Sequence, residues 1–81
     1  MPRYYFNLKD GRVSLDDEGT ELADIKAARQ EAVRFSGEVL RDGAGDSLWE
    51  GEPWRLWVTD QPNGKGMTFF TLDFSAREGS G

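Results

Sequence analysis

The residues best suited to chemistry in this chain are acids, because histidine and cysteine are both absent. Three of them are consecutive in the turn Asp16-Asp17-Glu18-Gly19, and closely spaced carboxylates are typical ligands of divalent cations. An EF-hand, however, spreads alternating ligands over about twelve residues and ends in a bidentate Glu, a spacing that is missing here. We therefore interpret residues 16–19 as a solvated turn before a helix, and we expect no metal.

The absence of Cys and His excludes the commonest catalytic and zinc sites. Without a thiolate or an imidazole, the chain has no disulfide, no usual zinc ligand set and no Cys-His or Ser-His-Asp nucleophile. Gly43-Ala44-Gly45 and Gly64-Lys65-Gly66 do not connect a strand to a helix as phosphate-binding loops do, so we interpret them as turns. Acid-base catalysis by two carboxylates needs a concave site, for which a domain this small offers little volume. We expect no enzyme and no cofactor.

A second group of residues combines a cationic side chain with aromatic rings. Aromatic residues beside an arginine stack nucleic-acid bases in single-strand binders, but they also dominate many protein interfaces. Fifteen acids against ten bases give a net charge of −5, which opposes binding to phosphates. We therefore predict a protein-interaction face, with nucleic acid disfavoured, that consists of Tyr5, Arg55, Trp57, Phe69 and Thr71.

One long helix is the element around which the rest is organised. Within the stretch 22–41, apolar residues recur at spacings of three and four and line one helix face: Ile25, Ala28, Ala32, Phe35 and Val39, widened by Val33, Ser36 and Leu40. Asp24 is the expected N-cap. The helix is expected to end near Arg41, with Gly43 as its left-handed stop.

Two hairpins flank this helix. Residues 3–9 alternate as a strand, and Asp10-Gly11 predicts a two-residue turn into a second strand with Val13 and Leu15. Residues 54–59 and 67–74 alternate in the same way around a longer loop. The connection 42–53 is irregular and acidic, and either Leu48 and Trp49 pack it onto the core or it is a mobile flap.

The sequence thus predicts an α+β fold of order ββαββ, in which one long helix packs on one face of a four-stranded, mainly antiparallel sheet with strand order 2-1-3-4. The helix-facing set is expected to be Tyr4, Phe6, Leu8, Val13, Leu15, Leu56, Val58, Phe70, Leu72 and Phe74. The opposite face would hold the interaction residues together with Asn7 and Thr59. The C-terminal tail or the Trp49 loop is an alternative cover for that face.

Residues at many positions resemble a family of short bacterial proteins, domain of unknown function 6894. The resemblance covers most of residues 1–41 and, more thinly, 54–76. The residues that carry it are Met1-Pro2-Arg3-Tyr4-Tyr5-Phe6, Asp10-Gly11, Asp17, Gly19, Glu21-Leu22, Asp24, Ala27-Ala28-Arg29, Glu31-Ala32, Val58, Asp60, Leu72 and Phe74. It implies a bacterial cytoplasmic setting and no particular reaction.

Length and patterning predict one domain over 1–76 and a frayed tail over 77–81. No apolar run is long enough to span a membrane, so we expect a cytoplasmic protein. We expect a small interaction module without catalysis that forms a homodimer, or binds another protein, through the aromatic face or an edge strand. The alternative is an antitoxin-like regulator that binds a protein or nucleic acid, with Arg3, Lys9, Arg12 and Arg55 gathered near the first hairpin.

Overall fold

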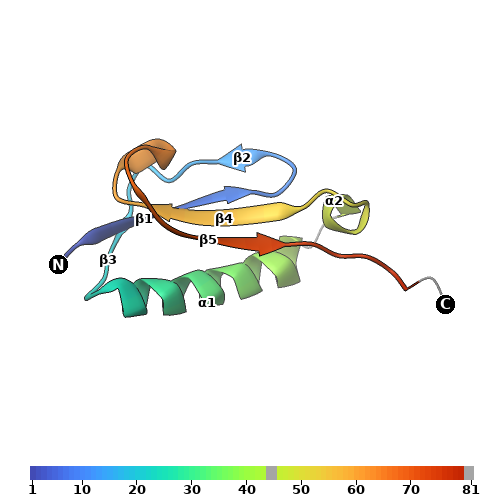
Figure 1. Ribbon diagram of the computed structural model, residues 1–81, viewed down its shortest axis with the longest axis horizontal. Coiled ribbons are helices and arrows are strands. Elements are labelled where there is room, and N and C mark those ends of the chain that lie inside the picture. Colours follow the sequence, from blue (N-terminus) through green and yellow to red (C-terminus); the bar gives the residue numbers. More distant parts are fainter. Residues whose placement is uncertain (44–45, 80–81) are drawn as a thin grey trace.

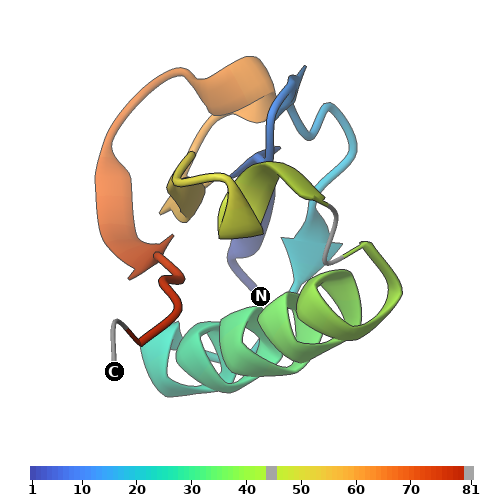
Figure 2. The ribbon, with the colours of Figure 1, turned by 90° about the vertical axis from the view of Figure 1, so that its right-hand side faces the viewer.

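The computed structural model describes residues 1–43 and 46–79 and has the predicted α+β architecture. A long helix, α1 (Ile25–Gly43), lies along one side of an antiparallel sheet in both views (Figures 1 and 2). The other elements, in chain order, are β1 (Arg3–Lys9), β2 (Val13–Ser14), β3 (Thr20–Glu21), α2 (Asp46–Trp49), β4 (Trp54–Thr59), the 3-10 turn η1 (Pro62–Gly64) and β5 (Thr68–Phe74).

The sheet has the order β2-β1-β4-β5, which confirms the predicted arrangement of the two hairpins. β1 and β4 are the two central strands, and β5 forms one outer edge. At the other edge, β2 pairs with the end of β1 and β3 pairs with its beginning. The strand β3 was not expected from the sequence, because a two-residue strand has no measurable alternation.

The core lies between the two central strands and α1. Tyr4, Leu8, Leu56 and Val58 are buried on the sheet side, and two alanines, Ala28 and Ala32, are fully buried on the helix side. The small alanine side chains allow the helix backbone to approach the sheet closely, while Phe6, Phe35, Val39, Phe70, Leu72 and Phe74 pack around this centre. The prediction that these strand residues face the helix is therefore confirmed.

Four apolar residues do not lie in the core as expected. Ile25, the first residue of α1, is 39 % exposed. Val33 is 64 % exposed, because it follows Ala32 on the helix and each residue turns the side chain by about 100°. Val13 and Leu15 are 57 % and 45 % exposed. The hairpin loop is three residues long rather than two, since Lys9 pairs with Val13, and β2 ends after Ser14. The second strand is thus too short to carry both side chains over the core.

Both ends of α1 can be compared with the prediction. The Asp24 carboxylate accepts a hydrogen bond from the Ala27 amide at 2.9 Å, which confirms the N-cap. The helix includes Gly43 and so runs two residues past Arg41, and Gly43 is helical rather than the residue after the helix. Ala44 and Gly45, the remainder of one predicted glycine turn, lie outside the described residues.

The connection to β4 contains a short helix, α2, that was not predicted. Leu48 is buried, whereas Trp49 is 56 % exposed, so only the first of the two expected anchors packs on the protein. The buried Trp54 indole N–H donates to the Ser47 hydroxyl at 3.1 Å, which ties α2 to the start of β4. Residues 75–79 follow β5 without helix or strand, and residues 80–81 lie outside the described part.

Candidate functional site

The sheet face opposite α1, which we call the outer face, is partly covered by two segments of the chain. The segment 15–19 and the turn η1 meet there, and the Asn63 amide donates to the Asp16 carbonyl at 2.8 Å. Gly64 sits over Leu15 and Trp57, because a Cβ at Gly64 would lie 3.2 Å from Leu15 Cδ2 and 3.7 Å from Trp57 Cζ2. The cover is therefore neither the C-terminal tail nor the Trp49 loop, the two alternatives considered from the sequence.

A buried polar network lies beneath this cover. Asn7, expected to be exposed, has no exposed surface, and its side-chain amide donates to the carbonyls of Tyr5 and Trp57 and to the Thr59 hydroxyl. The Thr59 hydroxyl, also fully buried, donates to the Gln61 carbonyl. Burying these groups is tolerated because each is hydrogen-bonded. The alternation of the strands predicted the correct sheet face for Asn7 and Thr59. The expectation that this face is exposed at both residues is wrong.

Asp16 closes the outer edge of β1 between β2 and β3. Its carboxylate accepts hydrogen bonds from the amides of Phe6, Glu18 and Gly19, each at 3.0 Å, and its own amide donates to Asn7 Oδ1. Burial raises the pKa of Asp16, but the bonds from Gly19, Phe6 and Glu18 and the charge of Arg3 together outweigh it, so the pKa lies below 3.8. Asp16 is thus a structural residue, ionised at neutral pH.

The structure brings together three of the five predicted interaction residues. Arg55, Trp57 and Thr71 line a shallow hollow of about 330 Å³ on the outer face, together with Lys9 and Thr68. The Arg55 guanidinium forms an ion pair of 2.7 Å with Asp73, its cross-strand neighbour. The hollow thus holds two cations, Lys9 and Arg55, and Asp73 balances the charge of Arg55.

Tyr5 is separated from this hollow by the segment that crosses the outer face. Its ring packs against Gly19, where an added Cβ would lie 2.8 Å from Tyr5 Cε2. The Gly19 backbone has a φ of 75°, which glycine adopts without strain. Tyr5 is half-buried as a result, and little of its ring is available to a partner.

Phe69 lies away from Trp57, on the side of the sheet that faces the core. The pairing of β4 with β5 shifts between Val58 and Thr59, where Val58 faces Phe70 and Thr59 faces Thr68, so Phe69 is an extra residue on β5. Such a bulge turns a side chain away from strict alternation. The Phe69 ring packs on the buried Tyr4, with the ring centroids 5.2 Å apart, and the expectation that it joins the outer face is wrong.

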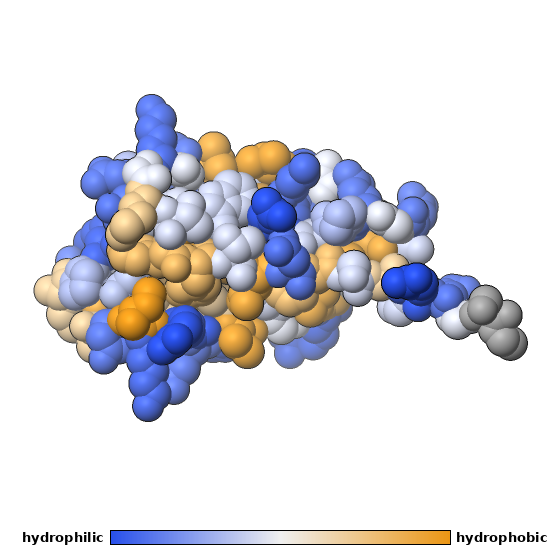
Figure 3. Space-filling view, viewed as in Figure 1, coloured by the Kyte–Doolittle hydropathy of each residue, from blue (hydrophilic) through white to orange (hydrophobic). Residues whose placement is uncertain are grey.

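The most open feature of the sheet is the edge formed by β5. This strand has seven residues, of which only Asp73 is charged, and among the described residues it pairs with β4 alone. Natural proteins usually protect such an edge with charges, prolines or a covering segment. Figure 3 shows hydrophobic side chains gathered along this side of the molecule, and the apolar residues of β5 that remain partly exposed are Phe69, Phe70, Leu72 and Phe74.

Within residues 1–43 and 46–79, no three of the acidic side chains come close enough to hold a metal ion. Over the same residues, neither helix has the length and apolarity needed to cross a bilayer.

Comparison with known proteins identifies the family. The model of the family described as a domain of unknown function (DUF6894) matches residues 3–75 of this 81-residue chain. No curated protein and no solved structure is significantly similar to it. The resemblance predicted from the sequence is confirmed, and the chain belongs to the DUF6894 family.

Proposed function

We propose that this protein is a small interaction module that self-associates through β5, with two copies pairing their β5 strands to extend both sheets. The observation that carries the proposal is the length and composition of this edge: seven residues with one charge and no covering strand among those described. Pairing would satisfy the outward N–H and C=O groups of β5. It would also bring the partly exposed Leu72 and Phe74 of the two copies together.

The edge is better suited to this role than the outer face. Trp57 is half-buried beneath η1, Tyr5 packs on Gly19, and Phe69 faces the core side. What is left of the outer face is the shallow hollow beside Arg55. The bulge at Phe69 protects the first residues of β5, so pairing would use the regular stretch from Phe70 to Phe74.

The antitoxin-like alternative depends on a gathering of four cations. Lys9 and Arg55 are cross-strand neighbours and Arg12 follows in the adjoining loop, but Arg3 lies at the opposite end of β1, paired with Glu21 at 3.0 Å. Asp73 also neutralises Arg55. These contacts favour a protein partner over nucleic acid. Along with self-association we propose a bacterial, cytoplasmic setting, of which family membership supports the bacterial part.

The test is the solution mass across a concentration series, measured by light scattering after gel filtration. Self-association through β5 predicts that the wild type is a dimer and that the double variant Thr68→Lys/Thr71→Lys is a monomer. Thr71 lies within the stretch that would pair and Thr68 flanks it, and both threonines are exposed, so the lysines place like charges in and beside the paired stretch without disturbing the core.

Two control variants separate the edge from the outer face. Thr68→Ser/Thr71→Ser changes the same positions without adding charge and should remain dimeric. Trp57→Ser removes the largest ring of the outer face and should also remain dimeric if β5 carries the contact. A wild type that is monomeric at every concentration contradicts the proposal. So does a dimer that Trp57→Ser dissociates and the lysine variant leaves intact.

A further inference from the structure

A groove lies between α1 and the β1–β2 hairpin, at the edge of the sheet opposite β5. The strands that pair with the outer edge of β1 are β2 and β3, and each has only two residues. They leave the space between this edge and α1 partly open, and this space is the groove. Its volume is about 520 Å³, within the range of small-molecule sites. The residues that line it are Phe6, Leu8, Ser14, Leu15, Asp16, Thr20, Glu31, Phe35 and Val39.

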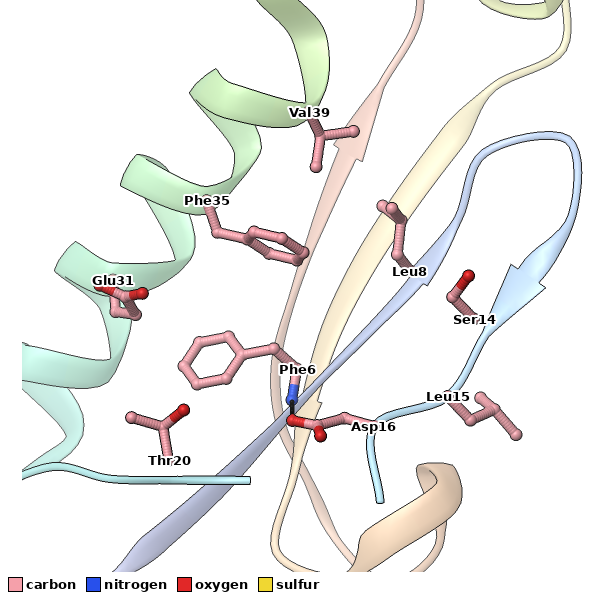
Figure 4. A pocket seen from close by; sticks show the side chains of 9 residues that line it. All are labelled: Phe6, Leu8, Ser14, Leu15, Asp16, Thr20, Glu31, Phe35 and Val39. Carbon is pink, nitrogen blue, oxygen red and sulfur yellow. Dashed lines mark hydrogen bonds between the residues drawn. The ribbon is translucent and has the colours of Figure 1, made fainter. Parts of the chain in front are cut away.

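The lining divides into an apolar part and a polar end. In Figure 4, the rings of Phe6 and Phe35 point toward each other into the groove, with Leu8 and Val39 beyond them. Glu31 and Thr20 lie at the other end, beside the Phe6 ring. The two aromatic side chains are each half-buried, so part of their surface faces the groove rather than the core.

The charges of the lining have one sign. Among the described residues that line it, the ionisable ones are Asp16 and Glu31, and the other polar side chains, Ser14 and Thr20, are hydroxyls. The Glu31 carboxylate accepts two hydrogen bonds from Arg34, at 2.9 and 2.5 Å, and Arg34 also pairs with Glu38 at 2.6 Å. One guanidinium thus lies between two carboxylates, which leaves this group of three side chains with a net negative charge.

Glu31 can accept further hydrogen bonds. An ionised carboxylate offers about four lone-pair sites, and Arg34 uses two of them. The hydrogen bonds from Arg34 also lower the pKa of Glu31, so it stays ionised at neutral pH. A carboxylate beside an aromatic ring attracts a cation both by charge and through the face of the ring.

We propose that this groove binds an organic ammonium ion, with the cationic head between Glu31, Thr20 and the Phe6 ring and the apolar chain along Phe35, Leu8 and Val39. The charge of the lining selects a cation over an anion, and the length of the apolar part selects an alkyl or aryl amine over a free metal ion. The site is separate from β5, so it does not depend on self-association.

The test is a titration followed by two-dimensional amide NMR with two probes that share one apolar body. Phenylbutylammonium carries the cationic head, and phenylbutanoate replaces it with a carboxylate. The proposal predicts saturable shifts of the Phe6, Thr20, Glu31 and Phe35 amides with the amine. With the acid, the shifts should need a concentration higher by about tenfold or more.

Matched variants test the role of Glu31. Glu31→Gln should weaken the amine by about tenfold, while Glu50→Gln changes an exposed acid that does not line the groove and should leave binding unchanged. Glu31 is half-buried and Glu50 is exposed, neither belongs to the core, and the amide spectrum of each variant without ligand shows that it is folded. Equal binding of the two probes, the absence of saturable shifts at these amides, or an unchanged affinity in Glu31→Gln would overturn the proposal.

Discussion

At the residue scale, a few polar side chains hold the two halves of the sheet together. Asn7 links β1 to β4 through Trp57 and Thr59, and it links both to the segment 15–19 through the Asp16 amide. Asp16 in turn occupies the position on β1 that a longer β2 would have filled. A buried network of this kind stabilises the fold only while each member keeps its partners.

The first prediction concerns Asp16. The variant Asp16→Asn keeps one oxygen for the Glu18 and Gly19 amides but turns an N–H₂ group toward the Phe6 amide, so two donors face each other. We expect a loss of about 1 to 3 kcal/mol in the free energy of unfolding at neutral pH, measured by urea denaturation. The neighbouring exposed acid provides the control, and Asp17→Asn should change stability by less than about 0.5 kcal/mol.

The same carboxylate predicts a dependence on pH. The folded state lowers the pKa of Asp16, so its contribution is present above the unfolded pKa of 3.8 and is lost as the pH falls through the lower folded value. The stability difference between wild type and Asp16→Asn should therefore shrink as the pH is lowered from about 5 to about 2. A difference that stays constant over this range would show that the Asp16 charge has no part in stability.

A second residue-scale prediction concerns Asn7. Asn7→Ala removes the acceptor of the Asp16 amide and the donor to the Thr59 hydroxyl, and it leaves a cavity under η1. The expected loss is about 2 to 4 kcal/mol in urea denaturation. Asn63→Gly, at an exposed position of η1, is a milder comparison, because glycine adopts the φ of 61° without strain and the backbone bond from Asn63 to Asp16 does not involve the side chain.

Burial of these polar residues could not be predicted from alternation alone. The alternating pattern assigns each strand residue to a face, and it did so correctly for Asn7, Thr59 and Trp57. Whether that face is exposed depends on where the loops cross, and the contact of Leu15 and Gly64 over Trp57 joins segments that are far apart in the sequence.

At the element scale, α1 was the most predictable part and the short strands the least. A helix of nineteen residues repeats its apolar spacing several times and carries a recognisable N-cap, whereas β2 and β3 have two residues each. The bulge on β5 also escaped prediction, because Phe69-Phe70 fits a regular strand as well as a bulged one. A bulge is fixed by the partner strand, which the local sequence does not specify.

Two glycines give opposite predictions at this scale. Gly37 lies within α1, and a Cβ there would have no atom within 4 Å among those described, so Gly37→Ala should raise stability by about 0.5 to 1 kcal/mol. Gly19 has a φ of 75°, and a Cβ there would lie 2.8 Å from both Arg3 Cγ and Tyr5 Cε2. Gly19→Ala should lower stability by at least about 1 kcal/mol.

Thermal unfolding of both variants is the measurement. A stabilised Gly19→Ala would mean that the turn over Tyr5 is free to move away from the ring. A destabilised Gly37→Ala would contradict the open space found beside Gly37.

At the scale of the whole molecule, the arrangement of the sheet leaves its two edges unlike each other. The β1 side is closed by β2, β3 and the Asp16 carboxylate, with the groove between them and α1, while the β5 side is open. The strand order was predicted from the sequence, and an edge strand was one of the two surfaces considered for association. The choice between the β5 edge and the outer face depends on the segments that cover Trp57. This cover is a tertiary contact between distant parts of the sequence.

The most direct test of association through β5 is amide hydrogen exchange, followed residue by residue at low and high protein concentration. Antiparallel pairing of β5 predicts that alternate amides from Phe70 to Phe74, those that point away from β4, exchange more slowly as the concentration rises. Amides of β2, at the opposite edge, serve as the internal control and should not change. If the outward amides of β5 exchange equally fast at all concentrations, β5 does not pair with a second copy.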